Sequence, residues 1–428
     1  MRPDRTRLAL GSYSTLLLFT LIAGDFWRNL ISWWGFVALA VALAIASGVL
    51  LVRLRPAFSW KKMPKLLGLF LAFATLSLAW SFYPGATALG LLAQYCTTIA
   101  GLFLALCLSW EELLRALGSA FRLVLGLSLL FEFVVAAFIR HPVLPFWTDY
   151  GSTKVPEAFY WSRGLLFHGG QIQGIQGNSN LLTMAALLAL IVFSIQLADR
   201  TVRRGWGITW IVIAVVTMAL TRSSTVIVAA LFTAAILLFA LWTRAAKPQH
   251  RLPIYASMLA GALVAIAVVW KFADQLLALL GKSDDLTGRT GIWKSVVDLA
   301  VQRPVFGWGW ISYWAPWVEP FKGLAVRKGV TYLQAHNAWL DVWLQLGIVG
   351  LVIFILVVIS ALWRTWFFAV DQPRITAGAP APFTAIALLP LLILAALIAQ
   401  SAAESRLLVE SGWALLVVVS VKTKLARS

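Results

Sequence analysis

The 428-residue sequence is poor in acidic residues, with 17 Asp and Glu against 35 Lys and Arg, and it has only two cysteines and four histidines. Cys96 and Cys107 fall in one apolar stretch, so no disulfide framework is implied. His and Cys do not cluster at the spacing of a zinc site, and no glycine-rich nucleotide fingerprint occurs. We therefore expect no metal and no nucleotide cofactor, and the energy for any reaction must arrive in the substrate.

What the sequence does have is hydrophobic residues, at 61% of positions, with a mean hydropathy of +0.85. Apolar runs of roughly 17 to 25 residues suffice to cross a hydrocarbon core. The sequence predicts an all-α polytopic membrane protein, with one membrane domain over residues 1–428. We expect twelve spans, near 8–25, 30–52, 66–83, 87–109, 117–139, 178–198, 205–221, 223–243, 253–272, 337–362, 383–401 and 407–421.

The distribution of Lys and Arg predicts the orientation of these spans, because short cytoplasmic connections retain basic residues. With both termini in the cytoplasm, only Arg28, Arg222 and Arg406 fall in short outer connections. The formal charge of +18 then mostly reflects topology and affinity for anionic inner-leaflet lipid. It is not the signature of a nucleic-acid-binding protein. The basic and then apolar N-terminus reads as an uncleaved first span.

Two outer connections are long, at 140–177 and 271–336. The second predicts an amphipathic helix from Arg289 to Val301, since its apolar residues recur at helical spacing. Those residues are Ile292, Trp293, Val296, Val297, Ala300 and Val301. Trp308, Trp310, Trp314 and Trp317 follow this helix. These tryptophans are typical of interfacial anchors, and stacking on sugar rings or lying along a lipid chain is the alternative.

His336 lies where the second long connection turns into a span, and it is the leading candidate for chemistry. An imidazole there can act as a general base near neutral pH. A bond to backbone or to a lipid headgroup is the structural alternative. Asn337 can cap the following helix or orient the imidazole, and Asp341 can tune it.

Arg222 and Arg289 are the leading candidates for anion binding. Arg222 lies in a tight outer turn and presents a fork of donors suited to phosphate oxygens. Arg289 opens the amphipathic helix, whose free N–H groups also favour an anion. The alternatives are a headgroup contact for Arg222 and a solvated side chain for Arg289. Lys282 and Lys294 are expected to be solvated.

Further polar residues could support the site from the first long connection. Arg163 and His168 could form a polar rim, and Asn178 or Asn180 could instead cap the sixth span. Glu132 lies inside the fifth predicted span and must be paired, protonated or facing a cavity, and we expect an arginine as its partner. The pair Asp284-Asp285 is expected to form an exposed turn.

The order of several short motifs resembles the O-antigen ligase family over roughly residues 175–350. These motifs are Gly177-Asn178-Ser179-Asn180, Arg222, Gly288-Arg289-Thr290, Arg303-Pro304-Val305-Phe306-Gly307-Trp308-Gly309, His336-Asn337-Ala338-Trp339-Leu340 and Leu346-Gly347-Ile348-Val349-Gly350. O-antigen polymerases and protein O-oligosaccharyltransferases share much of this segment. The His336-Asn337 element fits ligases and protein transferases better than polymerases.

The resemblance implies an inner-membrane enzyme of the GT-C type. Such an enzyme moves a glycan from undecaprenyl diphosphate to the lipid A core oligosaccharide, without metal, at the periplasmic face. The resemblance also implies that His336, Arg222 and Arg289 are essential. Residues 140–177 and 271–336 would then be periplasmic loops, the second capping the active site. We expect the enzyme to work as a monomer.

In the mechanism we expect, the two arginines bind the diphosphate while His336 takes the proton of the acceptor hydroxyl. No second carboxylate is evident for a covalent intermediate, which favours inversion in one displacement. His336 as a group that only orients the acceptor is the alternative. A lipid-linked oligosaccharide transporter is the rival from another class, but it would need charged groups spread through the bilayer depth. A structural subunit would leave the long aromatic loop unexplained.

Overall fold

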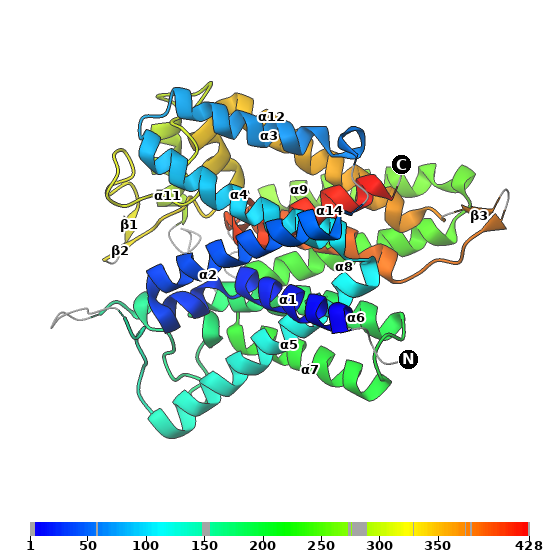
Figure 1. Ribbon diagram of the computed structural model, residues 1–428, viewed down its shortest axis with the longest axis horizontal. Coiled ribbons are helices and arrows are strands. Elements are labelled where there is room, and N and C mark those ends of the chain that lie inside the picture. Colours follow the sequence, from blue (N-terminus) through cyan, green and yellow to red (C-terminus); the bar gives the residue numbers. More distant parts are fainter. Residues whose placement is uncertain are drawn as a thin grey trace.

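A computed structural model describes residues 5–56, 59–147, 155–272, 275, 289–327, 329–372, 374–376 and 379–426. The described part is almost entirely helical, and each of the twelve predicted spans coincides with a helix (Figure 1). Lys282, Asp284-Asp285 and Gly288 lie outside the described residues. The prediction of an all-α polytopic membrane protein is confirmed.

Eight of the described helices are long and apolar enough to cross a membrane. They are α2 (Gly24–Leu54), α4 (Pro84–Cys107), α5 (Trp110–Val134, continued by a π-helical turn, Val135–Ile139), α6 (Ser179–Ala198), α7 (Arg204–Thr221), α8 (Ser224–Ala245), α9 (Leu252–Lys271) and α12 (Ala338–Val370). Four shorter helices match the remaining predicted spans, namely α1 (Arg5–Ile22), α3 (Lys65–Leu76), α13 (Leu389–Ser401) and α14 (Glu410–Leu425).

The other described elements are small. One further α-helix, α11 (Arg289–Ala300), lies outside the bundle, and two-stranded antiparallel hairpins pair β1 (Val326–Arg327) with β2 (Val330–Thr331) and β3 (Arg374–Thr376) with β4 (Ala379–Pro380). The short helical turns are Trp60–Lys62, Ser77–Ala79, Glu157–Phe159, Gly174–Gln176, Pro248–His250, Ile386–Leu388 and Arg406–Leu408.

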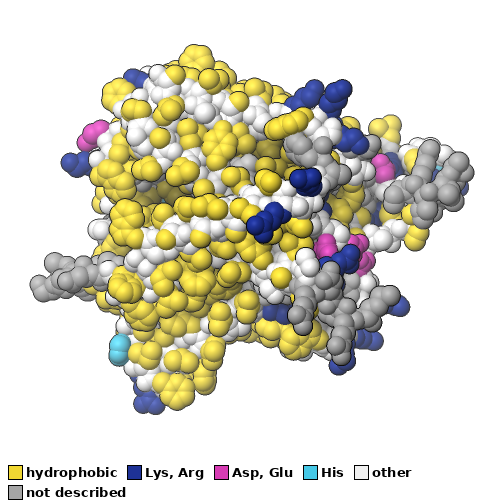
Figure 2. Space-filling model, viewed as in Figure 1, with side chains coloured by type: hydrophobic (Ala, Val, Ile, Leu, Met, Phe, Trp, Pro, Cys, Tyr) yellow, Lys and Arg dark blue, Asp and Glu magenta, His cyan; other side chains and the backbone are white. Residues whose placement is uncertain are grey.

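The core of the bundle is built around α6, α13 and α14, whose residues are mostly buried. Helix α4 packs against α14, α8 against α13, and α7 against α6. By contrast, α2, α8, α9 and α12 expose large apolar side chains, as lipid-facing helices must. Figure 2 shows such side chains covering the middle of the molecule.

The two ends of the bundle differ. Figure 1 places both termini at one end and α11 with the β1–β2 hairpin at the other. Figure 2 shows Lys and Arg gathered toward the end that holds the termini. This arrangement agrees with termini on one side of a membrane, and we call that side the inner end and the opposite side the outer end.

The described part of the second long loop has its own hydrophobic core. Trp308 and Trp314 are buried in it, and Trp310 is buried against the bundle. The expectation that these three tryptophans are interfacial anchors is therefore wrong, because the loop is long enough to bury them itself. Trp317 alone of the four remains exposed, at 74%.

The described helix α11, Arg289–Ala300, falls within the predicted amphipathic helix, but one position of its apolar face differs. Leu299 is buried, whereas Val301 lies beyond the end of the helix and is exposed. The prediction that Val301 belongs to the apolar face is wrong because the helix ends at Ala300, before Pro304.

The loop crosses α12 where that helix is broken. Gly347 has φ +65°, and a Cβ atom there would lie 2.1 Å from the carbonyl oxygen of Val305. Gly307, at φ +69°, would similarly meet the backbone of Gln345 at 2.5 Å. Only glycine allows two backbones to approach this closely at positive φ. The crossing fixes the loop on the first turns of α12.

Candidate functional site

His336 lies at the turn that opens α12. Its φ of +50° is left-handed, and the next residue, Asn337, is the N-cap. The Asn337 side chain accepts hydrogen bonds from the backbone N–H groups of Trp339, at 3.0 Å, and Leu340, at 3.2 Å. The prediction of Asn337 as a helix cap is confirmed, and the cap holds the His336 backbone at the edge of the helix.

A carboxylate that the sequence reasoning missed binds the imidazole. Glu404, in the connection between α13 and α14, lies with Oε2 2.8 Å from His336 Nδ1. Its other oxygen, Oε1, lies 2.8 Å from a terminal nitrogen of Arg289. Glu404 is only 4% exposed. One buried carboxylate therefore joins the two residues that the sequence had selected for chemistry and for anion binding.

Two further side chains, Gln334 and Asn337, fix Glu404 and its segment. Gln334 donates a 3.3 Å hydrogen bond to Glu404 Oε2 and accepts one from the backbone N–H of Ser405, also at 3.3 Å. On the other side, Asn337 Nδ2 donates to the carbonyl of Ala402 at 3.3 Å. The short α13–α14 connection is thus held against the turn of His336 by side chains on both sides of that turn.

The ionisation of Glu404 decides the tautomer of His336. Burial alone would raise the pKa of the Glu404 carboxyl, but the charges of His336, Arg289 and Arg406 outweigh it and hold the pKa below its ordinary value of 4.5. An ionised carboxylate can only accept hydrogen bonds, so His336 Nδ1 must carry the proton of this bond. The other ring nitrogen, Nε2, is left to take a proton from a substrate.

Asp341 accepts hydrogen bonds from the segments that surround the site. Its buried carboxylate accepts a hydrogen bond from the backbone N–H of Ala335 at 3.0 Å and one from Trp314 Nε1 at 2.9 Å. The hydroxyl of Ser405 also donates to it. Asp341 therefore ties the residues preceding His336, the loop core and the Glu404 segment together.

Arg289 reaches from the start of α11 toward the α7–α8 turn. A terminal nitrogen of its guanidinium lies 3.4 Å from Thr225 Oγ1, in the first turn of α8. Arg222, three residues earlier, is the left-handed C-cap of α7 and has an exposed side chain. The structure thus brings the buried Arg289 to the element that carries the exposed Arg222. Arg289 is ion-paired rather than solvated.

The first long loop covers the same turn. Gln171 Nε2 donates to the carbonyl of Arg222 at 3.4 Å, and the Asn180 side chain accepts a 2.7 Å hydrogen bond from Ser223. A Cβ atom added at Gly169 would lie 3.8 Å from the Arg222 guanidinium. Asn180 is therefore beside the site, whereas the cap of α6 is Asn178.

Arg163 and His168 lie further out in this loop. Arg163 pairs with Glu157 at 3.2 Å and donates to the carbonyl of Gln171 at 3.4 Å, so it braces the loop internally. His168 is exposed. Among the residues that the structure describes, no hydrogen bond or ion pair joins either side chain to His336, and their supporting role stays a prediction.

Glu132 is buried as expected, but its partner is not an arginine. Its carboxylate accepts a hydrogen bond from Ser162 Oγ at 2.8 Å and from the backbone N–H groups of Gln173, at 2.9 Å, and Gly174, at 2.7 Å. The prediction of an arginine partner is wrong because two main-chain donors and a hydroxyl satisfy the charge. Glu132 anchors the first loop to α5.

The sequence contains one signal that could have identified Glu404. Acidic residues are scarce, and Glu404 lies in a short outer connection between two apolar spans, where a carboxylate is costly unless it has a binding partner. Among the described residues, no group of three or more His, Cys, Asp or Glu is placed to hold a metal ion.

Comparison with known proteins now bears on this geometry. Residues 209–355 match the model of the O-antigen ligase family. The matched segment contains Arg222, Arg289 and His336, whereas Glu404 lies beyond it. The match supports a glycosyltransferase of the ligase or polymerase type in a multi-pass membrane protein.

A curated relative is the exopolysaccharide production protein ExoQ of Rhizobium meliloti (strain 1021). It is 28% identical over 127 residues, and the match covers 27% of this chain and 28% of the relative. The chain therefore matches less than a third of the length of that relative, and the likeness is confined to one part of each protein.

Proposed function

We propose that the protein is an O-antigen ligase with a GT-C type fold, which transfers a glycan from undecaprenyl diphosphate to the lipid A core oligosaccharide at the periplasmic face of the inner membrane. The observation that carries the proposal is the buried carboxylate of Glu404, which binds His336 and Arg289 at once. A base and an anion-binding group are thereby held in one rigid arrangement inside a family segment.

In the proposed reaction, His336 activates the acceptor. Its Nε2 takes the proton of a hydroxyl on the core oligosaccharide as that oxygen attacks the anomeric carbon of the glycan. Glu404 accepts the hydrogen bond of Nδ1–H and stabilises the imidazolium that forms, and it keeps the ring in the useful tautomer. Glu404 is a positioning residue in this scheme, because it acts through His336.

The donor side of the reaction falls to the two arginines. As the new glycosidic bond forms, the bond from the anomeric carbon to the diphosphate oxygen breaks, and undecaprenyl diphosphate leaves with the electron pair. Arg289 uses only part of its five N–H donors on Glu404 and Thr225, so others can meet phosphate oxygens. Arg222 is exposed three residues before Thr225, which Arg289 contacts, and in this proposal it binds the same diphosphate. The single displacement inverts the anomeric configuration.

A second candidate function follows from the named relative. An exopolysaccharide production protein suggests polymerisation, in which the acceptor is the sugar end of another lipid-linked glycan. The same base and anion-binding groups would serve that reaction, since only the acceptor differs. Protein O-oligosaccharyl transfer differs in the same way.

A purified reaction distinguishes these acceptors. Full-length protein in detergent is mixed with lipid-linked glycan and lipid A core, with EDTA present and with no nucleotide. We expect glycan attached to lipid A core, together with free undecaprenyl diphosphate. Longer lipid-linked glycan without any lipid A product would instead assign polymerisation. Product formation that EDTA abolishes and Mg²⁺ restores would overturn the metal-free mechanism.

A further inference from the structure

Four charged side chains form an ionic ring beside the segment that carries Glu404. Asp25 and Arg28, in the first turns of α2, meet Arg406 and Glu410, which lie just before and at the start of α14. Arg406 lies 2.5 Å from Glu410 and 3.3 Å from Asp25, and Arg28 pairs with the same two carboxylates. The ring therefore joins the α1–α2 turn to the connection between α13 and α14.

The two arginines are equivalent within the ring but differ in what lies beyond it. The Arg28 guanidinium packs on the rings of Trp33 and Phe36, 4.5 and 4.4 Å from their centroids. Arg406 instead lies two residues after Glu404 in the same short connection. Of the two arginines, only Arg406 is therefore coupled to the candidate site through the chain.

The ion pairs of Arg406 hold the Glu404 segment from its C-terminal side. Asp25 and Glu410 bind the two terminal nitrogens of the guanidinium. Ser405, the residue between Glu404 and Arg406, is fixed separately by hydrogen bonds of its hydroxyl and its backbone N–H. A change at Arg406 would release the chain two residues from the carboxylate that binds the imidazole.

The charge of Arg406 also acts on Glu404 through space. Burial would raise the pKa of the Glu404 carboxyl, and the charges of His336, Arg289 and Arg406 together lower it. His336 and Arg289 are hydrogen-bonded to the carboxylate, so Arg406 is the member of this group that acts without contact. Its side chain is only 15% exposed, and solvent and salt screen such a charge weakly.

We infer that Arg406 is a positioning residue for glycan transfer, which holds Glu404 in place and ionised so that Glu404 can orient His336. The inference rests on the proposed function, because it needs His336 to be the base. Arg406 does not touch the substrate in this scheme, since the carboxylates of the ionic ring bind its terminal nitrogens. Arg28, with the same two partners, serves the fold alone.

Arg28→Gln and Arg406→Gln form a matched pair that tests this difference. Each keeps the stem of the side chain and a hydrogen-bond donor, and each leaves the same two carboxylates with one arginine. Both side chains are 15% exposed. Arg28 also loses its contacts with two aromatic rings, so its variant should lose at least as much stability.

The measurement is kcat and KM for the lipid-linked donor, with full-length protein in detergent below the melting temperature of both variants. We expect Arg406→Gln to lower kcat about tenfold with KM unchanged, as couplings within one ionic network allow. Arg28→Gln should lower kcat by less than about twofold. Equal losses of kcat in the two variants would overturn the inference and leave the ring a structural feature.

A double-mutant cycle tests whether Arg406 acts through Glu404. In the Glu404→Gln background the carboxylate charge is absent, so adding Arg406→Gln should lower kcat no further than adding Arg28→Gln. Losses that multiply independently would overturn the inference and leave the proposed function intact. Full activity of Glu404→Gln alone would instead overturn the role of Glu404 in the proposed function, and this inference with it.

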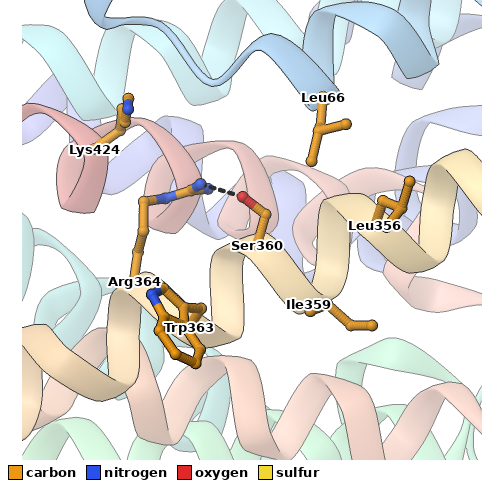
Figure 3. A pocket seen from close by; sticks show the side chains of 7 residues that line it. All are labelled: Leu66, Leu356, Ile359, Ser360, Trp363, Arg364 and Lys424. Carbon is orange, nitrogen blue, oxygen red and sulfur yellow. Dashed lines mark hydrogen bonds between the residues drawn. The ribbon is translucent and has the colours of Figure 1, made fainter.

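An arginine at the inner end is the control for loss of positive charge in general. Arg364 donates to Ser360, one turn earlier on α12 (Figure 3). Because α12 runs from Ala338 to Val370, Arg364 lies near the end of that helix opposite His336. Arg364→Gln should leave kcat and KM unchanged. A fall in kcat as large as that of Arg406→Gln would show that the effect is not specific to Arg406 and would overturn the inference.

Discussion

The outer and inner ends of the molecule both gather basic side chains, but they compensate them differently. At the outer end, Arg289 is buried and pairs with Glu404, which also binds His336. At the inner end, Arg53, Arg55 and Lys65 are exposed to their surroundings. The difference indicates that the protein supplies counter-charges for the basic groups that it buries around His336 and leaves the exposed basic groups to water and lipid headgroups.

The reason lies in the cost of burying charge. A charged group withdrawn from water is costly unless a partner and hydrogen bonds satisfy it. The groups around His336 are covered by two loops, so their partners must come from the protein. The exposed basic side chains at the inner end can be neutralised by water and by headgroup phosphates. Internal pairing fixes the geometry of a reaction site, which neutralisation by the surroundings cannot do.

A second cluster at the outer end follows the same rule. Arg406 pairs with Glu410 at 2.5 Å and with Asp25 at 3.3 Å, and Arg28 pairs with the same two carboxylates. Arg28 and Arg406 are two of the three exceptions to the positive-inside pattern. Both are explained by structural pairing. Arg222, the third exception, is exposed and so is available to a substrate.

The largest expected effect comes from His336→Ala, which removes the proposed base from the outer end. Transfer of glycan should fall by about 10² to 10⁴, the usual worth of general-base catalysis. The measurement is the initial rate of product formation with purified protein of unchanged thermal stability. His141→Ala, an exposed histidine of the first outer loop, is the control and should retain full activity. Near wild-type transfer by His336→Ala would remove it from the mechanism.

Next in size is the loss of stability from Arg406→Ala. Removing this partner leaves Asp25 and Glu410 with one arginine between them, and the side chain is only 15% exposed, so we expect a loss of about 3 kcal/mol. Thermal unfolding in detergent measures it. Arg53→Ala at the inner end removes an exposed charge and should change stability by less than about 0.5 kcal/mol. Comparable losses in both variants would contradict the difference between the two ends.

The helices and the leading site residues could be predicted because their signals are local. The length of the apolar runs predicts the spans. Asparagine is a preferred N-cap residue, and the backbone partners of Asn337 lie only two and three residues away. Helical periodicity correctly predicted a helix over the residues of α11. Each of these features depends on residues within one or two turns of each other.

The contacts that turn these residues into a site could not be predicted, because they join distant segments. Glu404 meets His336 across 68 positions and Arg289 across 115. The burial of Trp314 depends on Phe321 and Asp341, which are brought together only when the loop folds. The sequence shows that a carboxylate or an arginine near a membrane span needs a binding partner, but it does not show which distant residue is that partner.

A smaller effect on catalysis is expected from Glu404→Gln, which keeps the shape of the side chain and removes its charge. The imidazole loses the carboxylate that orients it, and a drop of about 10- to 100-fold is typical when such a partner is lost. Glu404→Asp keeps the negative charge and should recover part of the lost rate. A Glu404→Asp variant that is no faster than Glu404→Gln would reduce Glu404 to a structural role.

Arg222→Ala tests the exposed arginine of the α7–α8 turn, which forms no ion pair among the residues that the structure describes. We expect the KM for the lipid-linked donor to rise about tenfold, the value of a charge-assisted hydrogen bond, while kcat falls less. Arg140→Ala is a matched control, because Arg140 is also exposed and also a left-handed helix C-cap in an outer connection. A similar rise in both variants would show that outer positive charge, rather than Arg222 itself, attracts the donor.

The smallest expected effect is the pH dependence of the stability that Glu404 contributes at the outer end. Because the pKa of Glu404 is lowered on folding, its ionised form stabilises the fold fully above the ordinary value of 4.5, and the contribution disappears as pH falls through the lower folded value. The difference in melting temperature between wild type and Glu404→Gln should therefore be constant above that pH and narrow below it. Glu157→Gln, with a side chain 85% exposed, should show no such change. A gap that widens on acidification would mean that Glu404 is protonated in the folded protein, and His336 would then lack the partner that sets its tautomer.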